Sequence, residues 1–279
     1  MGKYQEYIQK LERELKYRNY STKTIKAYIT CIKIFLEYLG SEISSELLLN
    51  DISREKIIDF LLYLKSKNKA PKTVNLYKES IKFFYRDVLK NQVEIDIKLS
   101  REAKKLPVVL TNNEIKTILN CIKNEKHKFI IALSYGSGLR VSDTINLHVG
   151  DFDLENLTIH IKGGKGEKDR ITIFPECLKK DIIKLSGLKN GNELLIESER
   201  GGKLTTRTLQ KIFSEAIKKS GIKKNATFHS LRHSFATHLL ENGVDVRYIQ
   251  ELLGHANIKT TQIYTKVMNP KLNNIKSPF

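Results

Sequence analysis

Residues 229–240 read HSLRHSFATHLL, and residues 252–264 read LLGHANIKTTQIY. In the first stretch, apolar residues recur three and four positions apart, which predicts a helix over about residues 231–241. His229 and Arg232 lie one turn apart at its start, so their side chains can reach one point from the same face. The His-x-x-Arg pattern is short enough to arise by chance, and by itself it assigns no function.

His229 and His233 are four residues apart, which is also the spacing of two zinc ligands on a helix. The glutamate of the H-E-x-x-H zinc motif is missing, and no third ligand is evident. We therefore predict no metal site, and we expect His233 and His238 to be packing or surface residues. By the same reasoning, Tyr264 taken alone would be a half-buried aromatic residue with its hydroxyl in water.

A glycine-rich turn precedes Arg140, because residues 136–143 read GSGLRVSD. Glycine lets the backbone approach a ligand closely, and a guanidinium can donate two parallel hydrogen bonds to one phosphate. An arginine after a glycine turn is more often an ordinary surface residue. The motif indicates a phosphate site only in combination with the other motifs of the sequence.

Residues 157–161 and 170–173 alternate as β-strands do, and KGGKGEKD joins them at residues 162–169. This pattern predicts a β-hairpin with a lysine-rich tip. Elsewhere in the second half, helices are predicted at about residues 111–122, 126–134, 175–184, 206–219, 246–252 and 260–267. Thr111 and Glu114 form a capping-box signature at the first of them.

The first hundred residues predict four helices, at 4–18, 22–39, 54–67 and 72–89. Periodicity is then lost before a charged run that ends at Pro107. We therefore expect a helical domain at residues 1–98, a linker at 99–107 and a second domain at 108–279.

Two of the predicted helices begin with the same pattern, K-T-[IV]-x-x-Y, at Lys23 and Lys72. A helix N-terminus attracts phosphate through its free N–H groups and its dipole. Ordinary helix initiation with a buried tyrosine explains the pattern equally well.

The chain is strongly basic, with 49 Lys+Arg against 31 Asp+Glu, a net charge of +18 and a pI of about 9.6. Both halves share the excess, which favours a polyanionic partner contacted by both domains. A solvated basic surface without such a partner is the alternative that charge alone leaves open.

Three cysteines, Cys31, Cys121 and Cys177, are widely spaced and form no C-x-x-C pair. This argues against a disulfide framework or a thiolate zinc site and fits a reducing cytoplasm. The longest apolar run is far too short to span a bilayer, so we expect no membrane segment.

The segments GLRVSD, GGKGEKDR, HSLRHSFATHLL and LGHANIKTTQIY, in this order, resemble the motifs of the tyrosine recombinase (phage integrase) family. The Xer branch is the most similar, and residues 244–266 resemble archaeal Xer proteins in particular. The motifs cover most of residues 107–267. The helical N-terminal part resembles the family's core-binding domain more loosely.

This resemblance implies a mainly α fold: a helical core-binding domain that contacts DNA, and a mostly α catalytic domain with a small antiparallel sheet. It also assigns roles by position. Asp143 matches an acidic residue that supports the site, and the six catalytic positions are Arg140, Lys165, His229, Arg232, His255 and Tyr264. Lys23, Lys72, Arg207 and Lys211 are expected to approach DNA.

The implied reaction cuts and rejoins double-stranded DNA at a specific site, through a 3′-phosphotyrosyl intermediate formed by Tyr264. The arginines favour the phenolate, His229 helps to take its proton, and Lys165 protonates the leaving 5′-oxygen. Neither a metal nor ATP is implied. Four protomers are expected to assemble on two sites, in an Xer-type resolution of chromosome or plasmid dimers.

Two other functions remain open at this point. A type IB topoisomerase uses the same Arg, Lys, His and Tyr chemistry but relaxes supercoils as a monomer. A DNA-binding regulator or a decayed integrase would bind without cutting, although the complete set of six residues argues against decay.

Overall fold

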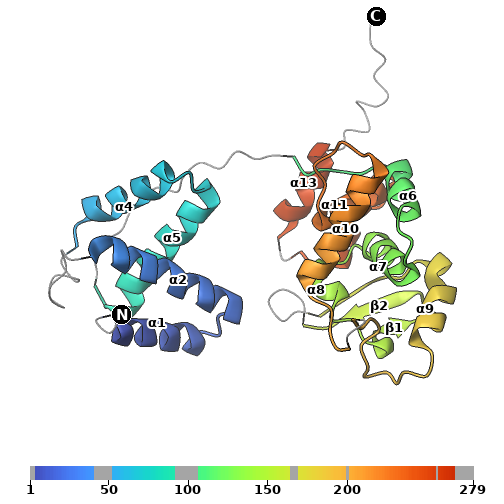
Figure 1. The fold of residues 1–279 in the computed structure, drawn as a ribbon, viewed down its shortest axis with the longest axis horizontal. Coiled ribbons are helices and arrows are strands. Elements are labelled where there is room, and N and C mark those ends of the chain that lie inside the picture. The colour runs from blue at the N-terminus through green and yellow to red at the C-terminus, as the bar shows by residue number, and fades with distance from the viewer. Residues whose placement is uncertain are drawn as a thin grey trace, which may run out of the picture. The chain divides into compact units, whose positions relative to one another are not determined.

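The computed structural model describes residues 4–40, 52–91, 106–163, 169–198, 201–255 and 257–267. The chain divides into two compact units, Met1–Lys104 and Lys105–Phe279, each with its own apolar core. The described part of the first unit is helical, and the three strands belong to the second unit (Figure 1). The expected mainly α fold with a small antiparallel sheet is confirmed.

The helices of the first unit begin where capping residues predict them to begin. The Ser21 and Ser53 side chains accept hydrogen bonds from backbone N–H groups in the first turns of their helices, and Pro71 occupies the first turn of another. The helices are α1 (Gln5–Tyr17), α2 (Thr22–Leu39), α4 (Arg54–Ser66) and α5 (Pro71–Phe83).

Aromatic rings form the centre of this first core. The ring centroids of Phe35 and Phe60 are 5.0 Å apart, and those of Phe60 and Tyr77 are 5.7 Å apart. Phe83, the last residue of α5, lies 5.8 Å from Tyr28 near the start of α2. The end of α5 therefore contacts the first half of α2.

The helix expected over residues 72–89 changes form before its end. The α-helical part stops at Phe83 and continues as a π-helical turn, η2 (Phe84–Val88). Within this turn, the buried Asp87 carboxylate accepts a hydrogen bond of 2.8 Å from Arg18 at the end of α1 and one of 2.6 Å from Arg86. The π turn is thereby tied to the first helix.

The second unit contains eight α-helices among its described residues. They are α6 (Asn112–Asn120), α7 (Glu125–Gly136), α8 (Val141–Thr144), α9 (Lys179–Ser186), α10 (Thr206–Ser220), α11 (Phe228–Glu241), α12 (Val246–Leu253) and α13 (Ile258–Val267), of which α8 is a single short turn that the sequence did not predict. Two 3₁₀ turns accompany them, η3 (Val149–Asp151) and η4 (Glu176–Leu178). The capping box of Thr111 and Glu114 is present.

Helix α11 is the central helix of this unit, because it packs against α7, α10, α12 and α13. Its buried residues lie on more than one face, as expected for a helix surrounded by others. A capping box between Thr227 and Ser230 starts it at Phe228, three residues earlier than predicted. His229 and Arg232 therefore lie in its first turns.

The sheet is antiparallel, in the order β1 (Phe152–Asp153), β2 (Thr158–Ile161), β3 (Arg170–Ile173). The hairpin of β2 and β3 was predicted, and the two-residue β1 was not. Along β3 the buried residues are Arg170 and Thr172, while Ile171 is 60% exposed. The strand therefore turns its polar face towards α12, against which it packs.

No helix in the described ranges is long and apolar enough to cross a membrane.

Candidate active site

Arg140 is positioned by the glycine turn that follows α7. Gly138 has φ +60°, and a Cβ there would come within 2.4 Å of the Phe235 ring, so this position requires glycine. The turn ends at Arg140, which is the N-cap residue of α8. Its Nη2 donates to the carbonyl oxygen of Leu253 over 3.3 Å, which directs the guanidinium to the C-terminal end of α12.

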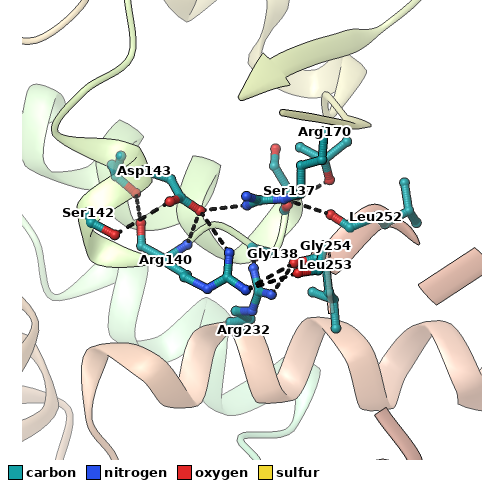
Figure 2. A network of polar contacts seen from close by, with 12 residues as sticks. Ser137, Gly138, Arg140, Ser142, Asp143, Arg170, Arg232, Leu252, Leu253 and Gly254 are labelled. Atoms are coloured by element: carbon teal, nitrogen blue, oxygen red, sulfur yellow. Dashed lines mark hydrogen bonds and ion pairs between the residues drawn. The ribbon is translucent and has the colours of Figure 1, made fainter. Parts of the chain in front are cut away.

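Arg232 reaches the same point from α11. Its side chain is 0% exposed; Nη1 donates to the Gly138 carbonyl at 2.8 Å, and Nη2 donates to the Leu253 carbonyl. The Leu253 carbonyl oxygen therefore accepts from both Arg140 and Arg232 (Figure 2). The two arginines that the sequence placed 92 positions apart converge on one atom.

Asp143 and Arg170 form a buried ion pair beside these arginines. The Arg170 Nη2 to Asp143 Oδ2 distance is 2.5 Å, and both side chains are almost fully buried. Asp143 Oδ2 also accepts the Arg140 backbone N–H at 3.1 Å, and Arg170 Nε donates to the Leu252 carbonyl at 3.1 Å (Figure 2). Asp143 thus contacts both Arg140 and Arg170, and the sequence had not singled out Arg170.

The buried charges in this cluster do not balance. The cluster holds the three guanidiniums of Arg140, Arg170 and Arg232 but the single carboxylate of Asp143, which pairs with Arg140 and Arg170. Burial, with smaller contributions from Arg140 and Arg170, lowers the pKa of Arg232 to about 9. Burial also lowers the pKa of Arg140. An anion bound here would offset this excess positive charge, which makes the cluster suited to a phosphate.

His255 follows the end of α12 through a second glycine turn. Gly254 has φ +60°, and a Cβ there would come within 2.6 Å of Arg170 Cδ. The His255 Nδ1 lies 2.9 Å from the Thr261 hydroxyl, which fixes the ring. Burial, with the charges of Arg232 and Arg140, lowers the pKa of His255 to about 3, so its ring is neutral at physiological pH.

Tyr264, on α13, is buried at the same site. It is 2% exposed, its ring lies nearly parallel to that of His255 (17° between planes, centroids 6.4 Å apart), and its hydroxyl lies 3.0 Å from His233 Nδ1. The alternative of a tyrosine with its hydroxyl in water is wrong. Burial raises the pKa of Tyr264, although Arg232 and Arg140 act in the opposite direction. The arginines thus favour the phenolate as expected, but burial outweighs them in the free protein.

The two histidines of HSLRH differ in their contacts with Tyr264. His229 is exposed, and its ring packs edge-on against that of His233 with centroids 4.5 Å apart. Among the described residues, His233 is the hydrogen-bond partner of the Tyr264 hydroxyl. His233 is thus neither a surface residue nor a mere packing residue. Over the described ranges, no group of three metal-ligating side chains gathers around this pair.

Lys165 lies outside the described residues, which resume on each side of its loop. On the β2 side, Lys162 Nζ lies 2.8 Å from the buried Asp151 carboxylate. On the β3 side, Asp169 accepts the Gly163 backbone N–H at 2.9 Å. Ile161 pairs with Arg170, which contacts Asp143, so the base of the hairpin adjoins the arginine cluster.

The four residues expected to approach DNA are all exposed. Lys23 and Lys72 lie in the first turns of α2 and α5. Arg207 and Lys211 lie one turn apart on α10, where Lys211 Nζ is 3.9 Å from the Glu215 carboxylate.

The buried Asp143–Arg170 pair makes a prediction about stability. Arg170→Met should lower the free energy of unfolding by about 3–5 kcal/mol, because it leaves the Asp143 carboxylate buried without its main partner. In a unit of this size the midpoint of thermal unfolding should fall by roughly 10 °C. Adding Asp143→Leu should recover part of the loss; a double variant less stable than Arg170→Met would show that the pair does not act as a unit. Thermal and urea denaturation of the full chain measure both.

Comparisons with known proteins agree with this site. Residues 108–270 match the phage integrase family, and residues 7–95 match the N-terminal SAM-like domain of phage integrases. The tyrosine recombinase XerA of Thermococcus kodakarensis is 36% identical over 274 residues, covering 96% of this chain and 93% of that protein.

Solved structures of recombinases share the fold. A crystal structure of XerA recombinase is 30% identical, with a TM-score of 0.55, and the match covers 97% of this chain and 96% of that one. The XerH site-specific recombinase bound to palindromic difH substrate, in a post-cleavage complex, is 26% identical with a TM-score of 0.73, covering 96% and 83%. The chain described here belongs to the phage integrase family, as a tyrosine recombinase of the Xer branch.

Proposed function

We propose that this recombinase cuts and rejoins duplex DNA through a 3′-phosphotyrosyl intermediate with Tyr264 as the nucleophile, in an Xer-type resolution of chromosome or plasmid dimers. One observation carries the proposal. The guanidiniums of Arg140 and Arg232 meet at the Leu253 carbonyl, in the same cluster as the buried Tyr264.

The arginines act on the phosphate. During displacement at phosphorus, negative charge spreads over the nonbridging oxygens, and fixed guanidiniums stabilise this charge more in the transition state than in the ground state. Arg140 and Arg232 are held in advance by backbone carbonyls, so they need little reorganisation when DNA arrives. A phosphate between them also restores the charge balance of the cluster.

The remaining catalytic residues supply contacts and protons. We assign a hydrogen bond to the scissile phosphate to His255 and to His229, and protonation of the leaving 5′-oxygen to Lys165. The phosphotyrosyl bond keeps the energy of the broken phosphodiester, and a second 5′-hydroxyl can attack it to reseal the strand. The proposed cycle thus runs without ATP, and these residues need no metal to perform it.

DNA is the partner of this recombinase, and a specific duplex site with a tetramer of four protomers assembled on two sites is the arrangement we propose. XerH, bound to its difH substrate, is a relative of known structure. Residues 1–98 would form the core-binding domain, 99–107 the linker and 108–279 the catalytic domain, in a cytoplasmic protein. Exposed cations at Lys23, Lys72, Arg207 and Lys211 would contact separate phosphates along the duplex.

A nicked duplex tests the central claim. If the bound site carries a nick close to the cleavage point, the short leaving strand diffuses away and the covalent adduct accumulates. We expect an adduct that survives denaturation. No adduct on a duplex that the protein demonstrably binds would identify a binding module, and relaxation of plasmids without any recombinant product would identify a topoisomerase.

Lys165→Ala tests the acid. We expect cleavage of normal DNA to slow by about 10²–10⁴-fold, because the 5′-oxygen leaves poorly without a proton. The same variant should cleave DNA with sulfur at the 5′ bridging position at close to the wild-type rate, since a thiolate needs little protonation. A deficit that persists on the sulfur substrate would remove Lys165 from the acid role.

A further inference from the structure

His233 contacts the reacting atom of the proposed nucleophile. The distance between its Nδ1 and the Tyr264 hydroxyl oxygen is 3.0 Å, and the two rings lie 5.5 Å apart at an angle of 56°. His233 directly follows Arg232 on α11, and the exposed His229 packs against its other side. The sequence alone did not indicate this contact between His233 and Tyr264.

The protonation states of the two residues allow the hydrogen bond to run from the tyrosine to the histidine. Tyr264 is buried, and burial raises its pKa, so the phenol keeps its proton in the free protein. Burial, with His229 and Arg232 as lesser causes, lowers the pKa of His233 to about 4, so its ring is neutral at physiological pH. A neutral ring that carries its proton on Nε2 accepts a hydrogen bond at Nδ1 from that hydroxyl.

We propose that His233 is the general base that activates Tyr264. In cleavage, the Tyr264 oxygen forms its bond to phosphorus while its proton passes to His233 Nδ1, and the bond from phosphorus to the 5′-oxygen breaks. In rejoining, an incoming 5′-hydroxyl gives its proton back to Lys165 and bonds to phosphorus, the bond from phosphorus to the tyrosine breaks, and the imidazolium of His233 returns its proton to the departing phenolate. This inference rests on the proposed function and adds a residue to it.

The transfer occurs together with bond formation. In the free protein the phenol is a far weaker acid than the imidazolium, so a complete transfer before attack is strongly unfavourable. Two changes make the proton transfer from Tyr264 to His233 favourable when DNA binds. A phosphate between Arg140 and Arg232 offsets the positive charge that disfavours the imidazolium, and the phenol becomes strongly acidic as its oxygen bonds to phosphorus.

The same helix carries a second histidine–tyrosine pair that serves as a control. His238 Nδ1 lies 2.8 Å from the Tyr135 hydroxyl, and burial raises the pKa of Tyr135 as it does that of Tyr264. The charged neighbour of that pair is Glu241 in place of the arginines. His238→Asn therefore removes the same type of contact without touching the proposed site.

His233→Asn tests the inference, because the amide can still hydrogen bond to Tyr264 but cannot accept its proton. We expect adduct formation on the nicked duplex to slow by about 10²–10⁴-fold, with DNA affinity unchanged. The loss should persist on the 5′-sulfur substrate, which distinguishes it from that of Lys165→Ala. His238→Asn should cleave at close to the wild-type rate on both substrates.

The pH profile supplies a readout that a structural role would not change. Without a base, cleavage by His233→Asn should rise about tenfold per pH unit towards the pKa of Tyr264, and a ring-fluorinated, more acidic tyrosine at position 264 should restore much of the rate. The other titratable and charged groups around this hydroxyl, His229, His255, Arg140 and Arg232, are unchanged in the variant.

The outcomes separate this inference from the proposed function. If the wild-type chain forms the adduct and His233→Asn forms it at a similar rate, His233 is not the base and the function stands. If the wild-type chain forms no adduct on a bound duplex, the function fails and the inference with it. Should His233→Asn unfold, the fluorinated tyrosine in the His233→Gln chain decides the question: no gain in rate from the more acidic phenol overturns the inference.

Discussion

Tyr264→Phe is expected to abolish the covalent adduct on a nicked duplex while DNA affinity stays within about twofold of the wild-type value. Phenylalanine keeps the ring that stacks on His255 and fills the same buried volume. It removes the hydroxyl that attacks phosphorus, and no other described side chain at the cluster offers a comparable nucleophile. Denaturing gels measure the adduct, and gel-shift titrations measure the affinity.

Tyr135→Phe is the matched control for this change. It also removes a tyrosine hydroxyl that is hydrogen-bonded to a histidine of α11, so its effect on stability should be similar, about 0.5–1.5 kcal/mol. Cleavage by this variant should remain close to the wild-type rate. An adduct that survives Tyr264→Phe would identify another residue as the nucleophile.

Helix starts were predictable because they depend on short capping signals. Ser21, Ser53, Pro71 and the Thr111–Glu114 box each act within a few residues, and the helices begin where these residues place them. Elements defined by distant partners were not predictable. The two-residue strand β1 has no periodicity of its own and exists through its pairing with Ile159 and Thr158 on β2.

The strand β3 shows how tertiary contacts override a pattern. The sequence RITI would conventionally bury its isoleucines, yet Arg170 and Thr172 are buried and Ile171 and Ile173 are exposed. The inward face is polar because Arg170 pairs with Asp143 and the Thr172 hydroxyl donates to the Ser137 carbonyl at 2.9 Å. An alternation with the polar residues inside was the one signal that could have drawn attention to Arg170.

The motifs predicted which residues meet, and the structure adds how they are charged. Arg140, Arg232, His255 and Tyr264 come together as their motifs implied, with Asp143 supporting Arg140. The role of His233 depends on a contact with a residue 31 positions away, and the protonation of Tyr264 depends on burial. Neither the His233 contact nor the burial of Tyr264 can be predicted from local sequence. The catalytic roles of these residues and of Lys165, and the DNA contacts expected of Lys23, Lys72, Arg207 and Lys211, stay predictions.

Arg232→Met is expected to slow cleavage by about 10³–10⁵-fold, because a fixed guanidinium on the transferring phosphoryl group is lost. Its effect on stability should be much smaller. Methionine fills a similar volume and removes repulsion from Arg140 and Arg170, while two hydrogen bonds to backbone carbonyls are lost. These opposing contributions are of similar size, so thermal unfolding should shift by only a few degrees.

Comparison with Arg170→Met distinguishes a catalytic role of Arg232 from a structural one. Both substitutions remove a buried arginine from one cluster, but Arg170 is paired with Asp143, whereas the buried Nε of Arg232 has no hydrogen-bond partner among the described residues. A donor left unsatisfied in the free protein is available to a phosphate. If Arg232→Met instead unfolds as easily as Arg170→Met, with cleavage reduced only in proportion to the unfolded fraction, Arg232 is part of the scaffold. Catalysis would then have to depend on Arg140 alone, which could not balance the charge that develops at phosphorus.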